Sequence, residues 1–170
     1  MDGNGSPVGH GVVEFRMDRH IADVSGSSND PRHPASAALL PGTFWITTGG
    51  YPQVLSVHFH RQVKLNKIGL LASGVQEISA HGNGGGANPF NDAGSIKLRP
   101  QRPSEDDLGV GLDDAALDMK HFIAKIEGDH DLYNRPTSTL TITLEKGTGD
   151  LFSVVRKVRV WGYPSWIKPP

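Results

Sequence analysis

Two histidines, His58 and His60, are the side chains in this sequence best placed for metal chemistry. They lie two residues apart in a segment where Leu55, Val57 and Phe59 alternate with polar residues, so both imidazoles project from one face of a predicted strand. Two imidazoles can begin a metal site, but a stable site needs a third and a fourth ligand. The sequence places no such ligands predictably beside them. We therefore expect both histidines to face solvent from the outer side of a sheet.

Other polar clusters lack the spacing that their chemistry needs. The glycine-rich stretch 82–86 is followed by Ala-Asn-Pro, whereas a phosphate-binding loop ends in Gly-Lys-Ser/Thr and leads into a helix. The acidic groups at 105–107 and 113–114 lack the ligand spacing and closing glutamate of an EF-hand. The sequence also has no Gly-x-Ser-x-Gly, no His-Glu-x-x-His and no cysteine, which excludes thiol catalysis and zinc–thiolate sites. We expect a protein that is not an enzyme.

The charge and hydropathy of the chain limit its partners. Lysine and arginine total 17 against 18 acidic residues, and the basic residues are scattered without aromatic residues between them. This balance does not favour a nucleic-acid partner. The longest apolar runs, such as 68–72, are far shorter than the roughly 20 residues that span a bilayer, and the N-terminus lacks a signal-peptide pattern. We expect a soluble protein of cytosolic origin with no direct membrane insertion.

Short strands separated by turns account for most of the sequence. The 21 glycines and 12 prolines favour many turns. Two alternating patterns, 55–60 and 63–68, predict two strands of a hairpin, whereas 117–127 fits either a strand or a helix. Further strands are expected over 12–15, 21–24, 68–72, 75–80, 94–102, 139–144 and 151–161. These elements predict an all-β protein built as an antiparallel β-sandwich.

The chain is expected to form one domain over residues 12–163. Residues 1–11 are rich in glycine and asparagine and are predicted to be a disordered terminus, and 164–170 form a short tail. Within the domain, residues 82–116 read as one long elaborated loop. A loop of this length inside a compact domain is either functional or disordered, and the composition favours disorder for much of it.

Several short motifs near the predicted hairpin resemble a known family. In order, they are His33-Pro34, Thr43-Phe44-Trp45, Thr47-Thr48-Gly49, Tyr51-Pro52-Gln53 and Phe59-His60-Arg61-Gln62-Val63. This stretch is similar to the discoidin-like, galactose-binding jelly roll of the intraflagellar transport protein 25 family, also known as small heat-shock-like proteins. The resemblance covers roughly residues 12–80 and 138–162. It implies a jelly-roll fold, favours a strand over 117–127, and places Phe44 and Trp45 in the core.

The resemblance also raises the question of a calcium site. Relatives often hold Ca²⁺ in the loop before Thr-x-Trp, through an Asp-Gly pair, nearby Asn or Asp oxygens, carbonyls and the threonine, and calcium takes six to eight oxygen ligands. In this chain only Thr43 persists, and the Asp-Gly pair is missing. Asn29 and Asp30 would be the additional ligands of a degenerate site, although an Asx-turn before the loop explains both better. We therefore expect no bound cofactor, and Ca²⁺ held by Thr43, Asn29 and Asp30 is the alternative.

In function, the resemblance implies a non-enzymatic adaptor subunit of the intraflagellar transport B complex, located in the cytoplasm and the cilium or flagellum. Its relatives form a heterodimer with a Rab-like small GTPase, intraflagellar transport protein 27, and act with other subunits of transport complex B. Candidate contact strips in this chain are His58 with His60 and the polar run 64–67, for which an exposed sheet face is the alternative interpretation. Tyr163 and Trp166 either cover an open end of the domain or form part of a partner surface.

Two alternatives belong to other functional classes. One is a discoidin-type module that binds a carbohydrate or a lipid headgroup, although secreted modules of that type generally carry disulfides and this chain has no cysteine. The other is a chaperone-like stress protein, which only the family's second name suggests.

Overall fold

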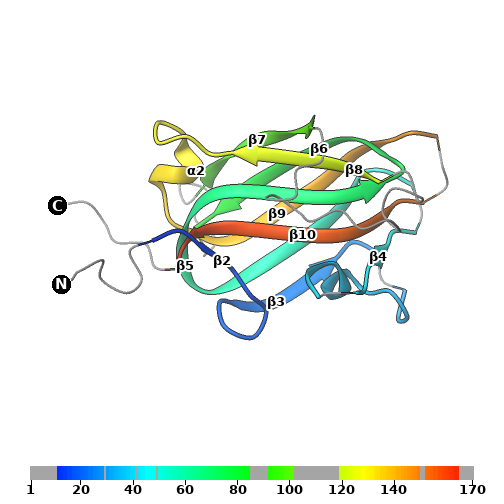
Figure 1. Cartoon of the computed structure of the whole chain (residues 1–170), viewed down its shortest axis with the longest axis horizontal. Helices are drawn as coiled ribbons and strands as arrows, with labels where there is room; N and C mark the ends of the chain where they lie inside the picture. The colour runs from blue at the N-terminus through cyan, green and yellow to red at the C-terminus, as the bar shows by residue number, and fades with distance from the viewer. Residues whose placement is uncertain are drawn as a thin grey trace.

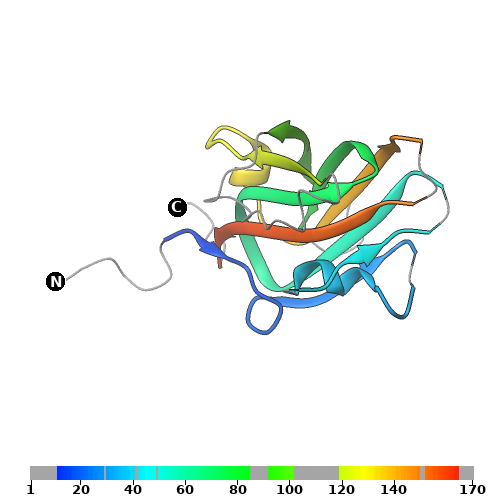
Figure 2. The same ribbon diagram turned by 45° about the vertical axis from the view of Figure 1, so that its right-hand side comes forward.

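The structure, a computed structural model, describes residues 11–28, 30–40, 42–48, 50–84, 92–101, 119–149 and 152–164. The described chain is almost entirely β-strand, folded into two packed antiparallel sheets (Figures 1 and 2). In chain order the elements are β2 (Val13–Glu14), β3 (Ile21–Gly26), the 3₁₀ helix η1 (Ala35–Leu39), β4 (Trp45–Ile46), β5 (Gln53–Ser73), β6 (Val75–Asn83), β7 (Asp92–Gln101), β8 (Lys120–Lys125), the short helix α2 (Asp131–Asn134), β9 (Thr137–Gly147) and β10 (Val154–Tyr163). The predicted all-β sandwich is confirmed.

Two sheets face each other across the core. In the front sheet of Figure 1, β5 lies between β8 and β10, β7 continues beyond β8, and β2 and β4 pair with the other edge of β10. In the back sheet, β9 lies between β6 and β5, with β7 beyond β6 and β3 beyond β5. One end of the sandwich carries α2 and the bend of β5, and the opposite end carries η1 and β4 (Figure 1).

The strand β5 is one continuous element of 21 residues, so the predicted hairpin over 55–68 is wrong. Its first part pairs with β3 and β9 in the back sheet, and its second part pairs with β10 and β8 in the front sheet. Residues 60–62 are exposed and mark the place where the strand passes from one sheet to the other. The sequence has no turn residues between the two alternating patterns, and the chain therefore bends while it stays extended.

The two sheets bury one shared hydrophobic core. The alternation predicted for β5 is confirmed, because Leu55, Val57 and Phe59 are all buried. Trp45 is fully buried, as expected. Phe44 is only half-buried and stacks on the ring of His33 at a centroid distance of 4.3 Å, so its predicted place in the core is wrong. The His33 ring on which Phe44 stacks lies in the loop at the η1 end of the sandwich and not between the sheets.

Two ambiguous segments of the sequence form strands. The interval 117–127 contains β8, and its residues 117 and 118 lie outside the described chain. Within the predicted loop 82–116, residues 92–101 form β7, in agreement with the weak strand pattern there. The other expectations for this interval, together with those for 1–10 and 165–170, lie outside the described residues.

Candidate partner-binding face

The outer side of the front sheet carries cations and aromatic rings side by side. Along β10 the inward residues Val158 and Val160 are buried, so Arg159, Trp161 and Tyr163 lie together on the outward side. The pairing of β10 with β5 places lysines opposite two of these residues. We call this surface the basic–aromatic face; its residues are Lys64, Lys67, Lys125, Arg159, Trp161, Tyr163 and Tyr133 of α2.

Trp161 lies between two cations at the centre of this face. The Lys67 ammonium is 4.8 Å from the centroid of the indole ring, and the Arg159 guanidinium carbon is 5.0 Å from it. Both distances fall within the range of cation–π attraction. Arg159 also donates to the carboxylate of Glu14 on β2, the strand that pairs with β10 at Trp161. The indole therefore contacts two cations, one from its own strand and one from β5.

Lys64 joins the sheet to α2 at the end of the face. Its ammonium lies 3.9 Å from the centroid of the Tyr133 ring and 5.4 Å from that of Tyr163. The two rings meet edge to face at 6.3 Å. A hydrogen bond from the Tyr163 hydroxyl to Tyr133, together with burial, raises the pKa of Tyr163. The two rings and the ammonium form one compact contact.

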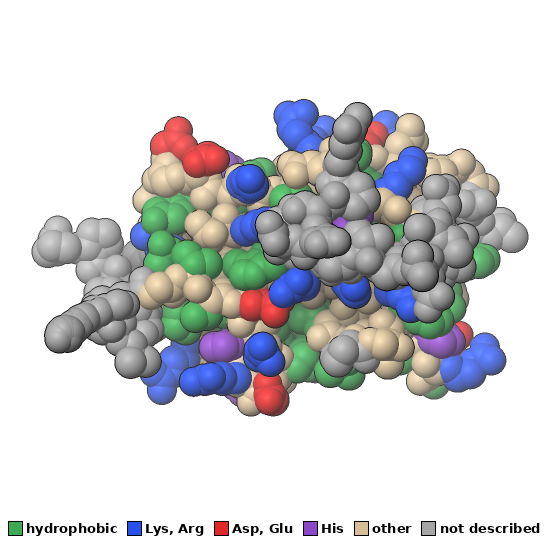
Figure 3. Space-filling model, viewed as in Figure 1, with side chains coloured by type: hydrophobic (Ala, Val, Ile, Leu, Met, Phe, Trp, Pro, Cys, Tyr) green, Lys and Arg blue, Asp and Glu red, His purple; other side chains and the backbone are tan. Residues whose placement is uncertain are grey.

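The face is more basic than the chain as a whole. Lys64, Lys67, Lys125 and Arg159 gather there with Glu14 as their neighbouring acid, whereas the whole chain has a formal net charge of −1. Figure 3 shows blue lysine and arginine side chains over β5 and β10, next to green apolar ones. Such a combination of cations and half-buried aromatic rings is typical of a protein-binding surface, and its charge complements an acidic partner.

The structure brings together some of the predicted contact residues and separates others. Lys64, Lys67 and Tyr163 lie on the face, and Trp166 lies outside the described residues. Asn66 is half-buried and its carbonyl oxygen accepts from the backbone of Ile126. Sequence reasoning missed Trp161 and Arg159, although their alternation with buried valines in β10 would have placed them beside Tyr163. It could not have found Tyr133, which reaches the face only through the tertiary placement of α2.

The two histidines of the predicted strand belong to different surroundings. His58 lies in the back sheet, with its Nδ1 atom 3.2 Å from the Thr139 hydroxyl oxygen. His60 is exposed at the bend of β5, where its backbone N–H donates to the His20 carbonyl. Within the part of the chain that the structure describes, no group of three histidine or acidic side chains is arranged to hold a metal.

The candidate calcium ligands have separate local roles. The Thr43 hydroxyl lies 2.6 Å from the Ala37 carbonyl oxygen and 3.1 Å from that of Leu40, so it supports the end of η1. The Asp30 carboxylate accepts from the Arg32 backbone N–H at 2.9 Å, the geometry of an Asx-turn, and these hydrogen bonds with Arg32 lower the pKa of Asp30. Asn29 lies outside the described residues.

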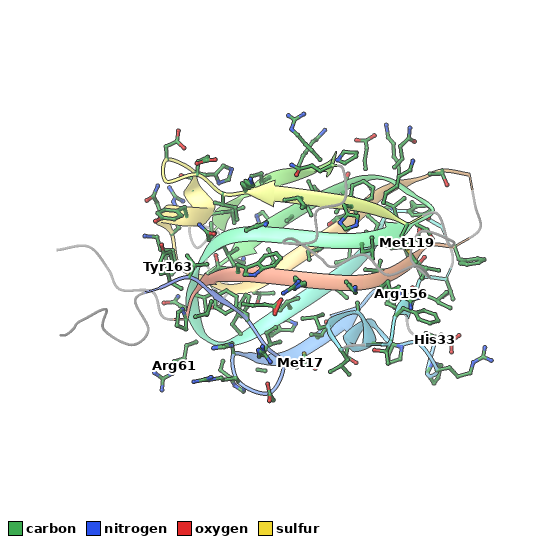
Figure 4. The ribbon with its side chains drawn as sticks, in the orientation of Figure 1. Met17, His33, Arg61, Met119, Arg156 and Tyr163 are labelled. Atoms are coloured by element: carbon green, nitrogen blue, oxygen red, sulfur yellow. The ribbon has the colours of Figure 1, made fainter. Side chains whose placement is uncertain are left out.

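A hollow of 320 Å³ lies at the η1 end of the sandwich, beside Thr43. It is lined by Arg32, by the stacked rings of His33 and Phe44, and by residues of η1. Figure 4 shows His33 at the end opposite Tyr163, so this hollow is remote from the basic–aromatic face.

Comparison with known proteins finds two kinds of similarity. No protein-family model matches the chain. The intraflagellar transport protein 25 homolog of Mus musculus is 38% identical over 47 residues, which are 26% of this chain and 33% of the mouse protein. The Homo sapiens homolog is 32% identical over 57 residues, 32% of this chain and 40% of the human protein. The matched segments thus span only a third to two fifths of the curated relatives.

Solved structures extend the similarity to most of the fold. The family 32 carbohydrate-binding module of C. perfringens NanJ, in complex with galactose, is 19% identical with a TM-score of 0.52, over 82% of this chain and 92% of that one. A family 32 module from a family 31 glycoside hydrolase of Clostridium perfringens is 13% identical with a TM-score of 0.51, over 82% and 90% of the two chains. At these identities the likeness shows a shared β-sandwich fold.

Proposed function

We propose that this chain is a non-enzymatic adaptor subunit in intraflagellar transport, acting in the cytoplasm and in the cilium or flagellum. Its basic–aromatic face would bind an acidic surface of a partner protein. The partner that the resemblance implies is a Rab-like small GTPase, with other subunits of transport complex B. The partial sequence similarity to intraflagellar transport protein 25 homologs supports this role.

The placement of Trp161 between Lys67 and Arg159 carries the proposal. Tryptophan, tyrosine and arginine are enriched among the residues that dominate binding energy at protein interfaces. Here an indole and two phenol rings lie next to one another and are held by cations of the same surface. A partner carboxylate would meet these cations and leave the rings to supply apolar contact. An interface of standard size buries roughly 1,600 Å² in total, and this face would form its centre.

The test is co-purification from a ciliated or flagellated cell through a high-salt wash. The wild-type chain should retain a Rab-like GTPase in stoichiometric amount. The charge reversals Lys67→Glu and Lys125→Glu together should abolish this retention, and Trp161→Ala should weaken the complex at least tenfold, as expected for a central aromatic contact. Lys97→Glu is the matched control, because Lys97 is a 78% exposed lysine of β7 outside the face.

The variants also show which result would contradict the proposal. Circular dichroism of each variant establishes that the sandwich is intact. If the folded double variant retained the GTPase as the wild type does, the basic–aromatic face would not be the interface. If the wild-type chain retained no transport subunit at all, the adaptor role itself would be wrong.

A carbohydrate-binding module is the second candidate function. The hollow beside η1 favours it, since the half-buried Phe44 ring, His33 and Arg32 combine an aromatic surface with polar groups at one end of the sandwich. Galactose should then raise the thermal unfolding temperature of the wild type, and Phe44→Ala should remove that rise. An unchanged melting temperature at saturating galactose would exclude galactose as the ligand.

A further inference from the structure

A second hollow, of 530 Å³, lies where the turn between β2 and β3 meets the bend of β5. Neither of the functions proposed above uses this hollow. Its lining includes three arginines and two histidines from two parts of the chain, together with Val13, Glu14, Val63 and Pro164. The five basic residues are Arg16, Arg19, His20, His60 and Arg61. Figure 4 shows Arg61 at the β5-bend end of the molecule, on the same lower edge of the view as Met17 of the turn between β2 and β3.

The turn that carries Arg16 and Arg19 is held in place by hydrogen bonds. The Arg16 carbonyl accepts from the N–H groups of Arg19, His20 and Ile21 at 3.2, 2.8 and 3.0 Å. The Arg16 N–H donates to His20 Nδ1 at 3.0 Å. The two arginines therefore project from a turn whose backbone is hydrogen-bonded.

The same turn is locked to the bend of β5. The His60 N–H donates to the His20 carbonyl at 2.9 Å, which brings the turn against the residues beside Arg61. Beneath it the buried Phe15 ring packs edge-on against Phe59, at a centroid distance of 5.1 Å. Arg19 and Arg61, about forty residues apart in the sequence, thus line one hollow.

The arginine side chains of this hollow form no ion pair with an acid of the described residues. Within the described residues, no carboxylate forms an ion pair with the side chain of Arg16, Arg19 or Arg61. The acid in the lining, Glu14, instead receives the Arg159 guanidinium. All three arginine side chains are exposed and can turn toward a ligand.

The half-buried imidazole of His20 lies beside these arginines. Burial, followed by the charge of Arg19, lowers its pKa, and Arg16 contributes in the same direction, while Asp18 opposes them. The part of this lowering that comes from Arg19 and Arg16 is the part that a bound anion would offset.

We propose that this hollow binds the phosphate group of a phosphorylated ligand, with Arg16, Arg19 and Arg61 as its principal contacts. Guanidinium groups donate paired hydrogen bonds that match the oxygens of a phosphate, which is why arginine is favoured in such sites. The imidazoles of His20 and His60 line the same hollow and add polar groups beside the guanidinium groups. The volume falls within the range of small-ligand pockets, so the phosphate would be one part of a larger ligand.

Titration of the full chain tests this inference with three probes: inorganic phosphate, a soluble inositol phosphate, and phosphatidylcholine vesicles with and without a phosphatidylinositol phosphate. Saturable binding of the inositol phosphate, with phosphate as a weaker competitor, is expected. Preference for the vesicles that contain the phosphorylated lipid would identify the source as a headgroup. Preference for the soluble probe would identify a free phosphorylated molecule. Both results support a phosphate site.

The variants decide whether the arginines form that site. Arg19→Gln with Arg61→Gln should weaken binding about tenfold or more, because two charge-assisted contacts are lost. Arg19→Lys with Arg61→Lys keeps the charge but not the paired hydrogen-bond geometry. Its affinity should lie between those of the wild type and the double glutamine variant. Arg99→Gln is the control, an exposed arginine of β7 that lines neither this hollow nor the one beside η1. Absence of binding to every probe, or unchanged affinity in the folded double glutamine variant, would overturn the inference.

Discussion

The ammonium group of Lys64 lies 3.9 Å from the centroid of the Tyr133 ring, and this contact joins the bent strand β5 to the short helix α2. Lys64 begins the part of β5 that belongs to the front sheet, opposite Tyr163. The contact therefore brings Tyr133 of α2 onto the outward side of the front sheet and completes the basic–aromatic face. It also ties the proposed interface to the stability of the domain.

Removing this ammonium should destabilise the domain slightly. We expect Lys64→Met, which keeps the apolar stem, to lower the free energy of unfolding by about 0.5–1 kcal/mol through loss of the cation–π attraction. Lys64→Arg keeps a cation and should restore most of the loss. Urea unfolding followed by circular dichroism measures both. Equal stability of the methionine variant and the wild type would show that the contact contributes nothing.

Gly162 should not tolerate a side chain. A Cβ atom at this position would overlap the Lys64 carbonyl oxygen and contact the Leu65 backbone, and these atoms belong to the ladder between β5 and β10. We expect Gly162→Ala to cost about 1–3 kcal/mol, because backbone atoms must move. Gly50→Ala is the control, since nothing lies within 4 Å of its added Cβ. Thermal unfolding of both variants makes the comparison, and equal melting temperatures would contradict the structure.

The buried amide of Gln53 holds two turns together. Its side chain is 6% exposed, accepts from the hydroxyls of Ser27 and Ser28, and donates to the Thr48 carbonyl. Gln53→Leu should lower the free energy of unfolding by about 1–3 kcal/mol, because it leaves these polar groups without their partner. Ser27→Ala deletes one of the donors and should have a smaller effect in the same urea titration. The reverse order of the two effects would argue against the network.

The lowered pKa of His20 predicts a pH dependence of stability. In the folded protein, burial and the charge of Arg19 keep this pKa below the reference value of 6.5. The unfolded chain therefore binds more protons between the two pKa values, so stability is complete above about pH 6.5 and falls as the pH drops from there to the folded pKa.

His20→Asn provides the comparison, because the amide oxygen can still accept from the Arg16 N–H but does not titrate. Urea midpoints of both proteins at about pH 7.5 and about pH 5.5 cover the window of histidine titration. The wild type should lose more stability on acidification than the variant. If both lost the same amount, His20 would not be the responsible group.

The Thr43 hydroxyl hydrogen-bonds to carbonyl oxygens at the end of η1, and we expect this role to need no bound cation. Thr43→Val should then lower the free energy of unfolding by about 1 kcal/mol, the net value of a hydrogen bond, equally in calcium and in a chelator. Thr43→Ser should retain most of the stability. If calcium stabilised the wild type but not the valine variant, Thr43 would be a calcium ligand.

Much of the strand pattern could be predicted from the residues alone. Leu55, Val57 and Phe59 alternate with polar residues, and such alternation requires an extended chain with one buried face. The short alternating segments separated by turns, and the motifs around Trp45, led to the correct all-β sandwich. Phe44 was misplaced, because composition cannot distinguish a core aromatic residue from one that stacks on a histidine in a loop.

The sequence by itself determined local properties of this protein: which segments are extended, which side of each strand is apolar, and which residues favour turns. These properties follow from side-chain periodicity and backbone preference within a few neighbouring residues. Only the tertiary structure decided that β5 passes from one sheet to the other, that Tyr133 meets Lys64, and that Arg16 and Arg19 share a hollow with Arg61. Such contacts depend on the path of the chain between distant residues, which local periodicity does not specify.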